Sequence, residues 1–132
     1  MKGIVFLGQH KLEIQEFEDP TPGPDEVILE IKASGMCGSD LKVYRAVDGP
    51  SSLGLGGEDK QVIAGHEPCG TIVELGKNVN KDNFKIDMNV MQHHYKGCGT
   101  CVHCSTGWQQ LCVDGVKEVF GVTGHGLSLI HI

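Results

Sequence analysis

Residues 97–112 read GCGTCVHCSTGWQQLC, and this stretch holds four of the six cysteines of the chain. The four are Cys98, Cys101, Cys104 and Cys112. Two residues lie between Cys98 and Cys101 and two between Cys101 and Cys104, and seven lie between Cys104 and Cys112. Structural zinc prefers four such ligands in a tetrahedron, and Gly97 and Gly99 let the backbone turn sharply enough to aim the thiols at one centre. The spacing therefore predicts a filled four-cysteine zinc site, which holds a loop and leaves no position open for substrate.

Other uses of four cysteines remain as less favoured alternatives. A bacterial iron–sulfur run closes with three residues and a proline, whereas here seven residues intervene and Val113 follows. Disulfides would need an oxidising compartment, which nothing in the sequence indicates. His93, His94 or His103 could each replace one thiol, but four sulfurs already complete the shell. We expect these three to be exposed loop histidines.

Composition favours a turn-rich β fold in one domain. The chain has 132 residues and 19 glycines, about twice the usual share of roughly 7%, with few aromatic residues. A net charge of −6 without a basic cluster argues against nucleic acid or an anionic membrane as partner. No apolar run approaches the ~20 residues of a transmembrane helix. The amino-terminal MKGIVFLGQHK is too short for a signal-peptide core and fits a first strand. We expect a cytoplasmic protein, in which clustered cysteines bind metals.

Alternating apolar residues predict strands. Val27, Leu29, Ile31 and Ala33 share one face of a strand at 27–33, and further strands are expected at 71–75 and near Val90. One or two helical turns are expected at 39–47, capped by Ser39 or Asp40, and a short helix at 105–112. The glycine-rich residues 49–60 predict a loop.

A second group of metal-ligating side chains lies outside the cysteine stretch. It consists of Cys37, in SGMCGSDL, and of His66 and Glu67, in AGHEPCGTIVELG. Sulfur, imidazole and carboxylate all suit zinc, but neighbouring side chains in an extended chain face opposite ways. His66 and Glu67 can therefore share a metal only if the chain bends at Gly65 or Pro68. From spacing alone, a buried histidine–carboxylate pair remains the commoner interpretation, and Cys69 is expected to be a small core residue.

Three motifs carry a family resemblance: SGMCGSDL, AGHEPCGTIVELG, and GCGTCVHC with a further cysteine after seven residues. In this order and spacing they resemble the zinc-containing medium-chain alcohol dehydrogenases, closest to the branch that holds the threonine, sorbitol and other secondary-alcohol dehydrogenases. The likeness runs from Met1 to about Gly126. It implies a mainly β fold, a GroES-like β-barrel with short helices and a zinc-bound lobe, whose Rossmann domain comes later and is absent from this chain. No strand here is followed by GxGxxG and a helix, and GLGGED (54–59) and GVTGHG (121–126) are expected to be turns.

The resemblance also implies roles for individual residues. Cys37, His66 and Glu67 would surround a catalytic zinc, and the four cysteines would bind a structural zinc. Ser39 would relay the alcohol proton, and Asp40 would orient the zinc-bound histidine. The implied chemistry is Lewis-acid activation of a small alcohol or carbonyl, with hydride transfer to NAD or NADP, in an enzyme that is a homo-oligomer at full length.

Three departures from the family pattern stand out. Lys42 replaces the histidine that continues the proton relay in many relatives, so relay at that position is in doubt. Asp87-Met88-Asn89-Val90 replaces the usual Gly-Asp-Arg-Val turn. The last six residues, LSLIHI, correspond codon by codon to a transposon adapter (CTG TCT CTT ATA CAC ATC), although a natural apolar strand is the alternative. We therefore expect residues 1–126 to be a truncated catalytic domain, inactive alone, and 127–132 to be a non-native tail.

A rival hypothesis from another class is a non-catalytic, zinc-stabilised β module that binds a partner. It predicts one zinc per chain, held by the four cysteines alone. It also predicts that Cys37→Ala and His66→Ala leave the metal content unchanged.

Overall fold

The computed structural model describes residues 1–47, 61–116, 118–125 and 129–131. Strands predominate, as predicted, and the helices are short. The loop expected at 49–60, including the turn at 54–59, lies outside the described residues. Among those residues, no helix combines the length and the apolar character that crossing a membrane requires.

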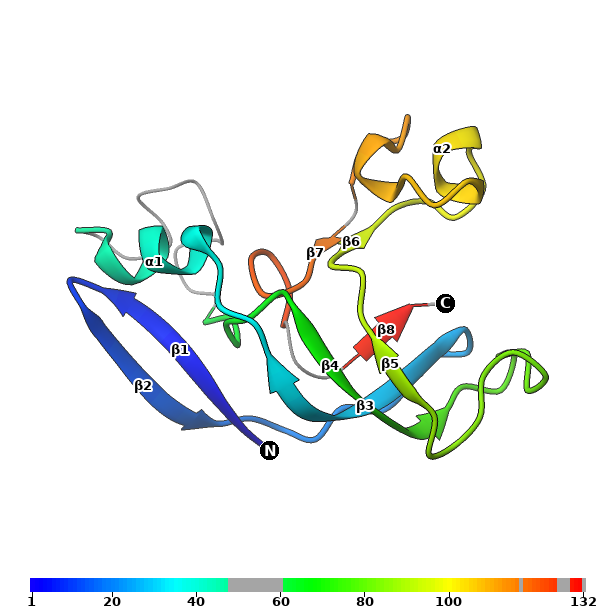
Figure 1. Ribbon diagram of the computed structural model, residues 1–132, viewed down its shortest axis with the longest axis horizontal. Coiled ribbons are helices and arrows are strands. Elements are labelled where there is room, and N and C mark those ends of the chain that lie inside the picture. The colour runs from blue at the N-terminus through cyan, green and yellow to red at the C-terminus, as the bar shows by residue number, and fades with distance from the viewer. Residues whose placement is uncertain (48–60, 117, 126–128, 132) are drawn as a thin grey trace.

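The main sheet has the strand order β5–β4–β3–β8, and each neighbouring pair is antiparallel (Figure 1). Its strands are β3 (Glu26–Ser34), β4 (Pro68–Leu75), β5 (Asn89–Met91) and β8 (Leu129–His131). The strands predicted at 27–33, at 71–75 and near Val90 are thereby confirmed. Val27, Leu29, Ile72 and Val79 form its buried core. Each such side chain contributes about 1.5–3 kcal/mol when it leaves water, so this cluster anchors the fold.

Strand β3 departs from the predicted alternation at its carboxyl end. Val27 and Leu29 are buried and Ile31 is half-buried, but Ala33 is exposed. The register against β4 shifts between Ile31 and Ala33, and such an irregularity turns the next side chain away from the face it would otherwise share. The placement of Ala33 on the apolar face was therefore wrong. Beyond this shift the chain leaves the sheet and leads into the first helix, α1 (Gly38–Arg45) (Figure 1).

The turn before β5 forms despite its unusual sequence. Asp87 adopts a left-handed conformation with φ of 68°, which aspartate tolerates better than most residues other than glycine. Its backbone N–H donates to Ile72 O at 2.9 Å, and Ile72 N–H donates to Met88 O at 2.9 Å. These bonds lead the chain into β5.

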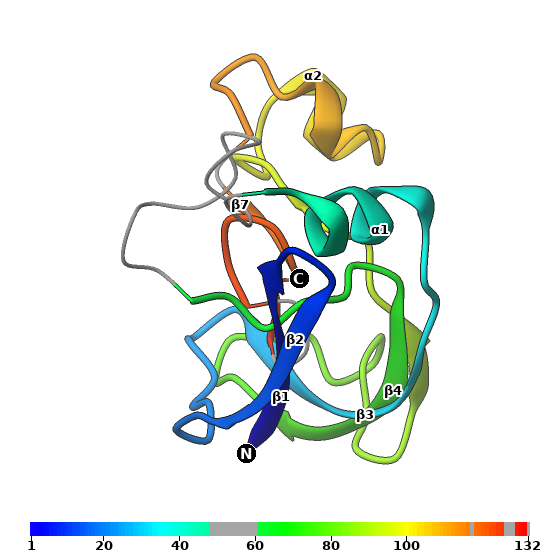
Figure 2. The ribbon, with the colours of Figure 1, turned by 90° about the vertical axis from the view of Figure 1, so that its left-hand side faces the viewer.

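A separate hairpin supports the first helix from below. It consists of β1 (Lys2–Gly8) and β2 (Lys11–Glu16), and α1 (Gly38–Arg45) lies over its tip (Figure 2). Gln9 and His10, at the turn, donate their backbone N–H groups to Ala46 O at 2.8 Å and Tyr44 O at 2.9 Å. These bonds satisfy carbonyls that every helix leaves unpaired at its carboxyl end. The hairpin thus fixes where α1, and Cys37 at its start, can lie.

The same hairpin positions the segment that precedes His66. Ala64 N–H donates to Ile4 O at 2.8 Å. A side chain at Gly3 would collide with Ile63, whose nearest atom would be 2.6 Å away. Glycine is required at this position because the buried Ile63 lies directly against the strand backbone.

The cysteine stretch forms a lobe that projects from the rest of the fold (Figures 1 and 2). It is joined through β6 (Tyr95–Lys96) and β7 (Glu118–Val119) and contains α2 (Val102–Ser105) and the 3-10 helix η2 (Gln109–Leu111). The single helix predicted at 105–112 was wrong. Gly107, with φ of 88°, interrupts it, since a left-handed residue cannot continue a right-handed helix. The turn predicted at 121–126 is confirmed over its described residues, where Gly121 donates to Gly124 O at 2.7 Å.

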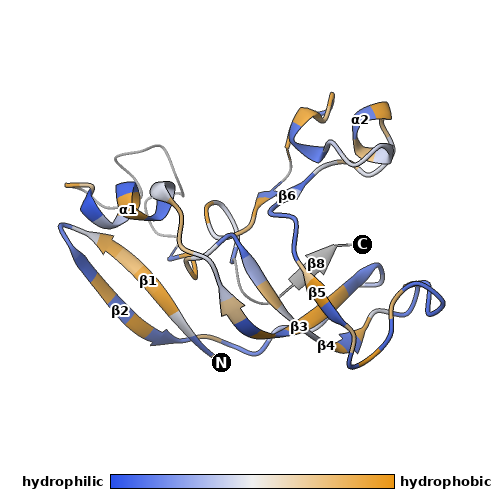
Figure 3. Ribbon diagram, in the orientation of Figure 1, coloured by the Kyte–Doolittle hydropathy of each residue, from blue (hydrophilic) through white to orange (hydrophobic). Residues whose placement is uncertain are grey.

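Hydrophobic residues concentrate on the strands, with β1 largely hydrophobic and β2 alternating (Figure 3). The alternation of β2 does not bury its apolar side, because Leu12 and Ile14 are 49% and 68% exposed. Backbone residues 129–131 pair with Glu26–Ile28 of β3. The origin of the last six residues stays a prediction.

Candidate metal centres

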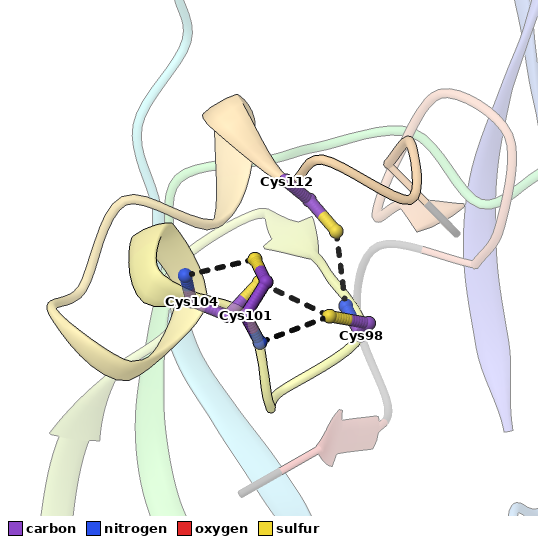
Figure 4. Close-up of side chains that lie close together, drawn as sticks. All are labelled: Cys98, Cys101, Cys104 and Cys112. Carbon is purple, nitrogen blue, oxygen red and sulfur yellow. Dashed lines mark hydrogen bonds between the residues drawn. The ribbon is translucent and has the colours of Figure 1, made fainter.

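The lobe brings its four cysteine sulfurs together, within 4.8 Å of one another (Figure 4). Cys98 follows β6, Cys101 caps the start of α2, Cys104 lies inside α2 and Cys112 follows η2. Sγ of Cys98 lies 4.0 Å from Sγ of Cys104. Backbone N–H groups point at the sulfurs, with Cys98 N donating to Cys112 Sγ at 3.3 Å and Cys101 N donating to Cys98 Sγ at 3.3 Å. Such donors stabilise thiolates, so the cluster has the chemistry and the spacing of a four-sulfur zinc site.

The two middle thiols differ in how readily they ionise. Hydrogen bonds from the backbone of Cys104 and Val113 lower the pKa of Cys101 to about 6. Burial raises the pKa of Cys104 to about 11. A buried thiol of this kind gives up its proton when a cation replaces it, which is how metal binding and deprotonation are linked.

The two glycines that flank Cys98 serve different purposes. Gly99 has φ of 80° and open space around it, so it provides the sharp turn that the sequence predicted. Gly97 has no such conformation, but a side chain there would collide with Sγ of Cys104. Gly97 is therefore needed for space and Gly99 for backbone geometry.

The second predicted group also converges. One ligand atom each from Cys37, His66 and Glu67 lies within 4.8 Å of the others. Sγ of Cys37 is 3.2 Å from Nε2 of His66. The bend that this arrangement requires occurs at Gly65, whose φ is 106°. The three donors are the mixed sulfur, nitrogen and oxygen set that suits a zinc site, so the residues present fit the ion.

Glu67 reaches the site across a closely packed backbone. Its carbonyl accepts a hydrogen bond from Gly35 N–H at 3.0 Å. A side chain on Gly35 would meet the Glu67 carboxylate itself. The glycine two residues before Cys37 thus leaves room for the carboxylate, which is otherwise exposed.

Asp40 lies behind His66, where the resemblance placed it. Asp40 and His66 are only 6% and 8% exposed, and Oδ1 of Asp40 is 3.2 Å from Nδ1 of His66. The contact is electrostatic and not a well-directed hydrogen bond, because Nδ1 has no partner of good hydrogen-bonding geometry. The other oxygen of Asp40 accepts the backbone N–H of Cys37 at 2.8 Å.

The start of α1 differs from the prediction. The N-cap is Cys37, whose sulfur accepts Ser39 N–H at 3.3 Å, while Asp40 reaches back to the N–H of Cys37 in a capping box. The prediction of Ser39 or Asp40 as the N-cap was wrong, since the helix begins at Gly38, two residues before the first position that a Ser39 cap would allow. Lys42 is exposed near the other end of the helix.

The Ser39 hydroxyl does not cap the helix and lies close to two of the proposed ligands, Cys37 and His66. Its Oγ is 2.8 Å from Sγ of Cys37 and 3.3 Å from Nε2 of His66. Hydrogen bonds from the Ser39 hydroxyl and the Ser39 N–H, with a smaller contribution from His66, lower the pKa of the Cys37 thiol.

His94 is a neighbour of this site that sequence reasoning missed. Its ring lies 5.4 Å from that of His66, at an interplanar angle of 62°. His94 and His103 are half-buried, so of the three histidines expected to be exposed only His93 is. Burial and the nearby His66 lower the pKa of His94. The sequence signal was the histidine pair just before the cysteine stretch, but nothing in its spacing pointed to His66.

Comparisons with known proteins give a consistent picture. The alcohol dehydrogenase GroES-like domain matches residues 23–129. The uncharacterized zinc-type alcohol dehydrogenase-like protein YphC of Escherichia coli K12 is 34% identical over 129 residues, covering 92% of this chain and 34% of that protein. L-threonine 3-dehydrogenase of Cutibacterium acnes is 35% identical over 113 residues, covering 86% of this chain and 31% of that protein. The structure of acetophenone reductase from Geotrichum candidum in complex with NAD has a TM-score of 0.76 and 29% identity, covering 99% of this chain and 38% of that one. The chain thus spans about a third of the length of the curated relatives it matches.

Proposed function

The chain belongs to the alcohol dehydrogenase GroES-like domain family, and on this premise we propose that it is the zinc-binding catalytic domain of an NAD(P)-dependent alcohol dehydrogenase. The proposed reaction oxidises an alcohol to a ketone or aldehyde, with hydride transfer to the nicotinamide. The nicotinamide would be bound mainly by a further domain of a longer parent protein, so we propose that this chain alone is inactive. NAD bound to the similar acetophenone reductase supports a nicotinamide cofactor.

The observation that carries the proposal is the convergence of Cys37, His66 and Glu67 beside the Ser39 hydroxyl. These residues come from the start of α1 and from the bend before β4, which are distant in sequence. A zinc ion held by them would act as a Lewis acid on a substrate oxygen. Only three protein ligands gather here among the described residues, in contrast to the closed set of four sulfurs in the lobe.

Two further residues have proposed roles in proton transfer and positioning. Ser39 Oγ, 3.3 Å from His66 Nε2 and 2.8 Å from Cys37 Sγ, is placed to accept the proton of a substrate hydroxyl. Asp40 faces Nδ1 of His66 and favours the tautomer that carries the proton there and leaves Nε2 available as a ligand. Lys42 is exposed on the helix, so the proton would continue to water or to the cofactor and not through that side chain.

The four cysteines have a structural role in this proposal. They would hold a second zinc and fix the lobe, which has two buried cysteines but few other buried apolar residues of its own. The parent protein would act on a small-molecule alcohol or carbonyl and form a homo-oligomer. We place it in the cytoplasm, since all six cysteines, each in the described part of the chain, are free thiols.

Metal analysis of the purified chain tests this function. We expect two zinc ions per chain, about one after Cys37→Ala or His66→Ala, and about one after Cys101→Ser. Cys69→Ser serves as the control, because Cys69 lies in β4 outside both groups, and it should retain two. The rival, a non-catalytic module, predicts one zinc in the unmodified chain and no change on altering Cys37 or His66. That result would contradict the catalytic proposal and leave only a structural zinc site in the lobe.

A further inference from the structure

The polar contacts of the two His66 ring nitrogens restrain the tilt of the ring only weakly. Nε2 faces Cys37 Sγ and Ser39 Oγ, and Nδ1 faces Asp40 Oδ1. The ring is tethered at Cγ, so its tilt is set by rotation about the Cβ–Cγ bond, and that rotation moves both nitrogens. The Nδ1 contact is too poorly directed to restrain this rotation firmly. A ligand lone pair lies in the ring plane, so the tilt decides where Nε2 can direct it.

His94 supplies a ring–ring contact to His66. The two ring centres are 5.4 Å apart and the planes meet at 62°, an edge-to-face arrangement. Because the two rings pack against each other, rotation of His66 about its Cβ–Cγ bond would bring its ring against His94. This packing adds a restraint that the polar contacts provide only weakly.

His94 is itself held in place from two sides. Its carbonyl accepts the backbone N–H of the buried Phe120 at 2.9 Å. Its ring lies 4.2 Å from the ring of Tyr95, the first residue of β6. His93, the exposed neighbour, has its ring 5.6 Å from that of His94.

We infer that His94 is a positioning residue, whose ring fixes the orientation of the His66 imidazole and so the geometry of the Cys37–His66–Glu67 site. The inference rests on the proposed function where it concerns metal binding, and on the structure alone where it concerns the ring. Its effect depends on the shape of the side chain and not on its charge, so phenylalanine should replace histidine at this position.

The ring signals of His66 in the nuclear magnetic resonance spectrum of the metal-free chain test the restraint directly. We expect one narrow set in the unmodified chain, in His94→Phe and in His93→Ala, and broadened or doubled signals in His94→Ala. Narrow His66 signals in His94→Ala, or broadened ones in His94→Phe, would overturn the inference. Unchanged signals from Tyr44 and His10, which contact each other on the hairpin side of the fold, show that a variant remains folded.

Titration with cobalt(II), a spectroscopic substitute for zinc, tests the consequence for the metal. In His94→Ala we expect about tenfold weaker cobalt affinity and altered visible absorption at the three-residue site, since residues that orient ligands influence affinity by about this factor. Cobalt at the four cysteines should be unaffected, and His94→Phe should bind nearly as the unmodified chain does. Unchanged cobalt affinity and spectrum in His94→Ala would overturn the inference and leave the proposed function intact. If the unmodified chain takes up only one cobalt, the proposed function fails, and the ring signals alone decide the role of His94.

Discussion

At the scale of single residues, the Ser39 hydroxyl gives the sharpest test of the proposed chemistry. In a chimera that joins this chain to the nicotinamide-binding part of a relative, Ser39→Ala should lower turnover by ~10²–10⁴, as expected for loss of an acid–base group. Both zinc ions should stay bound and cofactor affinity should be nearly unchanged, because Ser39 is not among the proposed ligands. Steady-state kinetics and metal analysis check both points.

The control for this variant is Ser105→Ala, which removes another exposed serine that donates to a carbonyl of α2. Its turnover should equal that of the unmodified chimera. Since Cys37 and not Ser39 caps α1, Ser39→Ala should not carry the roughly 1 kcal/mol cost of losing a cap. A less stable variant with normal turnover would refute the proton role and indicate a purely structural one.

Gly35 is the residue that leaves room for the Glu67 carboxylate. Gly35→Ala should push the carboxylate aside and weaken zinc binding at the three-residue site by about tenfold, while the fold persists because a flexible side-chain end can move. Gly38→Ala is the matched comparison, since a side chain there meets nothing within 4 Å. Competition with a chromophoric chelator measures both affinities. Equal affinities in the two variants would place Glu67 outside the metal site.

At the scale of elements, the lobe depends on the four cysteines more than on packing. Cys101→Ser should disorder residues 94–112 while β3 and β4 persist, because the substitution removes one of the four sulfurs although serine can still cap α2. Binding at a structural zinc site can contribute ~10 kcal/mol or more where folding depends on it. Hydrogen exchange should show lost protection in the lobe alone, and a chelator should reproduce the effect in the unmodified chain. Unchanged exchange in the lobe after zinc removal would contradict the structural role.

The strands show what alternation can and cannot predict. The strand at 27–33 and its first apolar positions followed from periodicity, because one side of β3 packs on the core. The exposure of Ala33 could not be predicted from periodicity, since the register shift beside it depends on pairing with a strand distant in sequence. Strands β6 and β7 have two residues each, too few for any periodic signal, and exist through pairing with each other.

The two metal groups were predicted with unequal help from the sequence. The four cysteines lie within sixteen residues, so local spacing sufficed. Cys37 and His66 meet only because the hairpin positions both α1 and the segment before His66, and their spacing carried little information without the family resemblance. The family and the mainly β fold predicted from three motifs were confirmed by the comparisons. His94 was missed because its neighbour is set by the tertiary structure.

At the scale of the whole molecule, one ion pair joins the lobe to the main sheet. Lys96 Nζ of β6 lies 3.1 Å from Glu26 Oε1 of β3, with side chains only 25% and 21% exposed. Glu26→Gln should lower the free energy of unfolding by about 1 kcal/mol, near the upper end for such pairs because partial burial reduces screening by salt. Glu26 also accepts Gly23 N–H at 2.9 Å through its other oxygen, which glutamine can still do.

Glu30→Gln is the comparison for this variant. It removes a pair of similar length with Lys32, 2.8 Å, whose side chains are 60% and 53% exposed. Glu30→Gln should change the free energy of unfolding by no more than about 0.5 kcal/mol. Urea unfolding at low and high salt measures both variants. If Glu26→Gln and Glu30→Gln lower the free energy of unfolding equally, the Lys96–Glu26 pair does not hold the lobe to the sheet.

Cys37 both caps α1 and is a proposed zinc ligand, and this combination bears on how the domain can evolve. Its sulfur accepts a helix N–H and is also a proposed ligand, and serine is among the residues best suited to the first of these tasks. A single nucleotide change converts a cysteine codon to a serine codon. Descendants of this domain can therefore abandon the metal in one step and keep the helix, so inheritance of the architecture does not oblige inheritance of the ion.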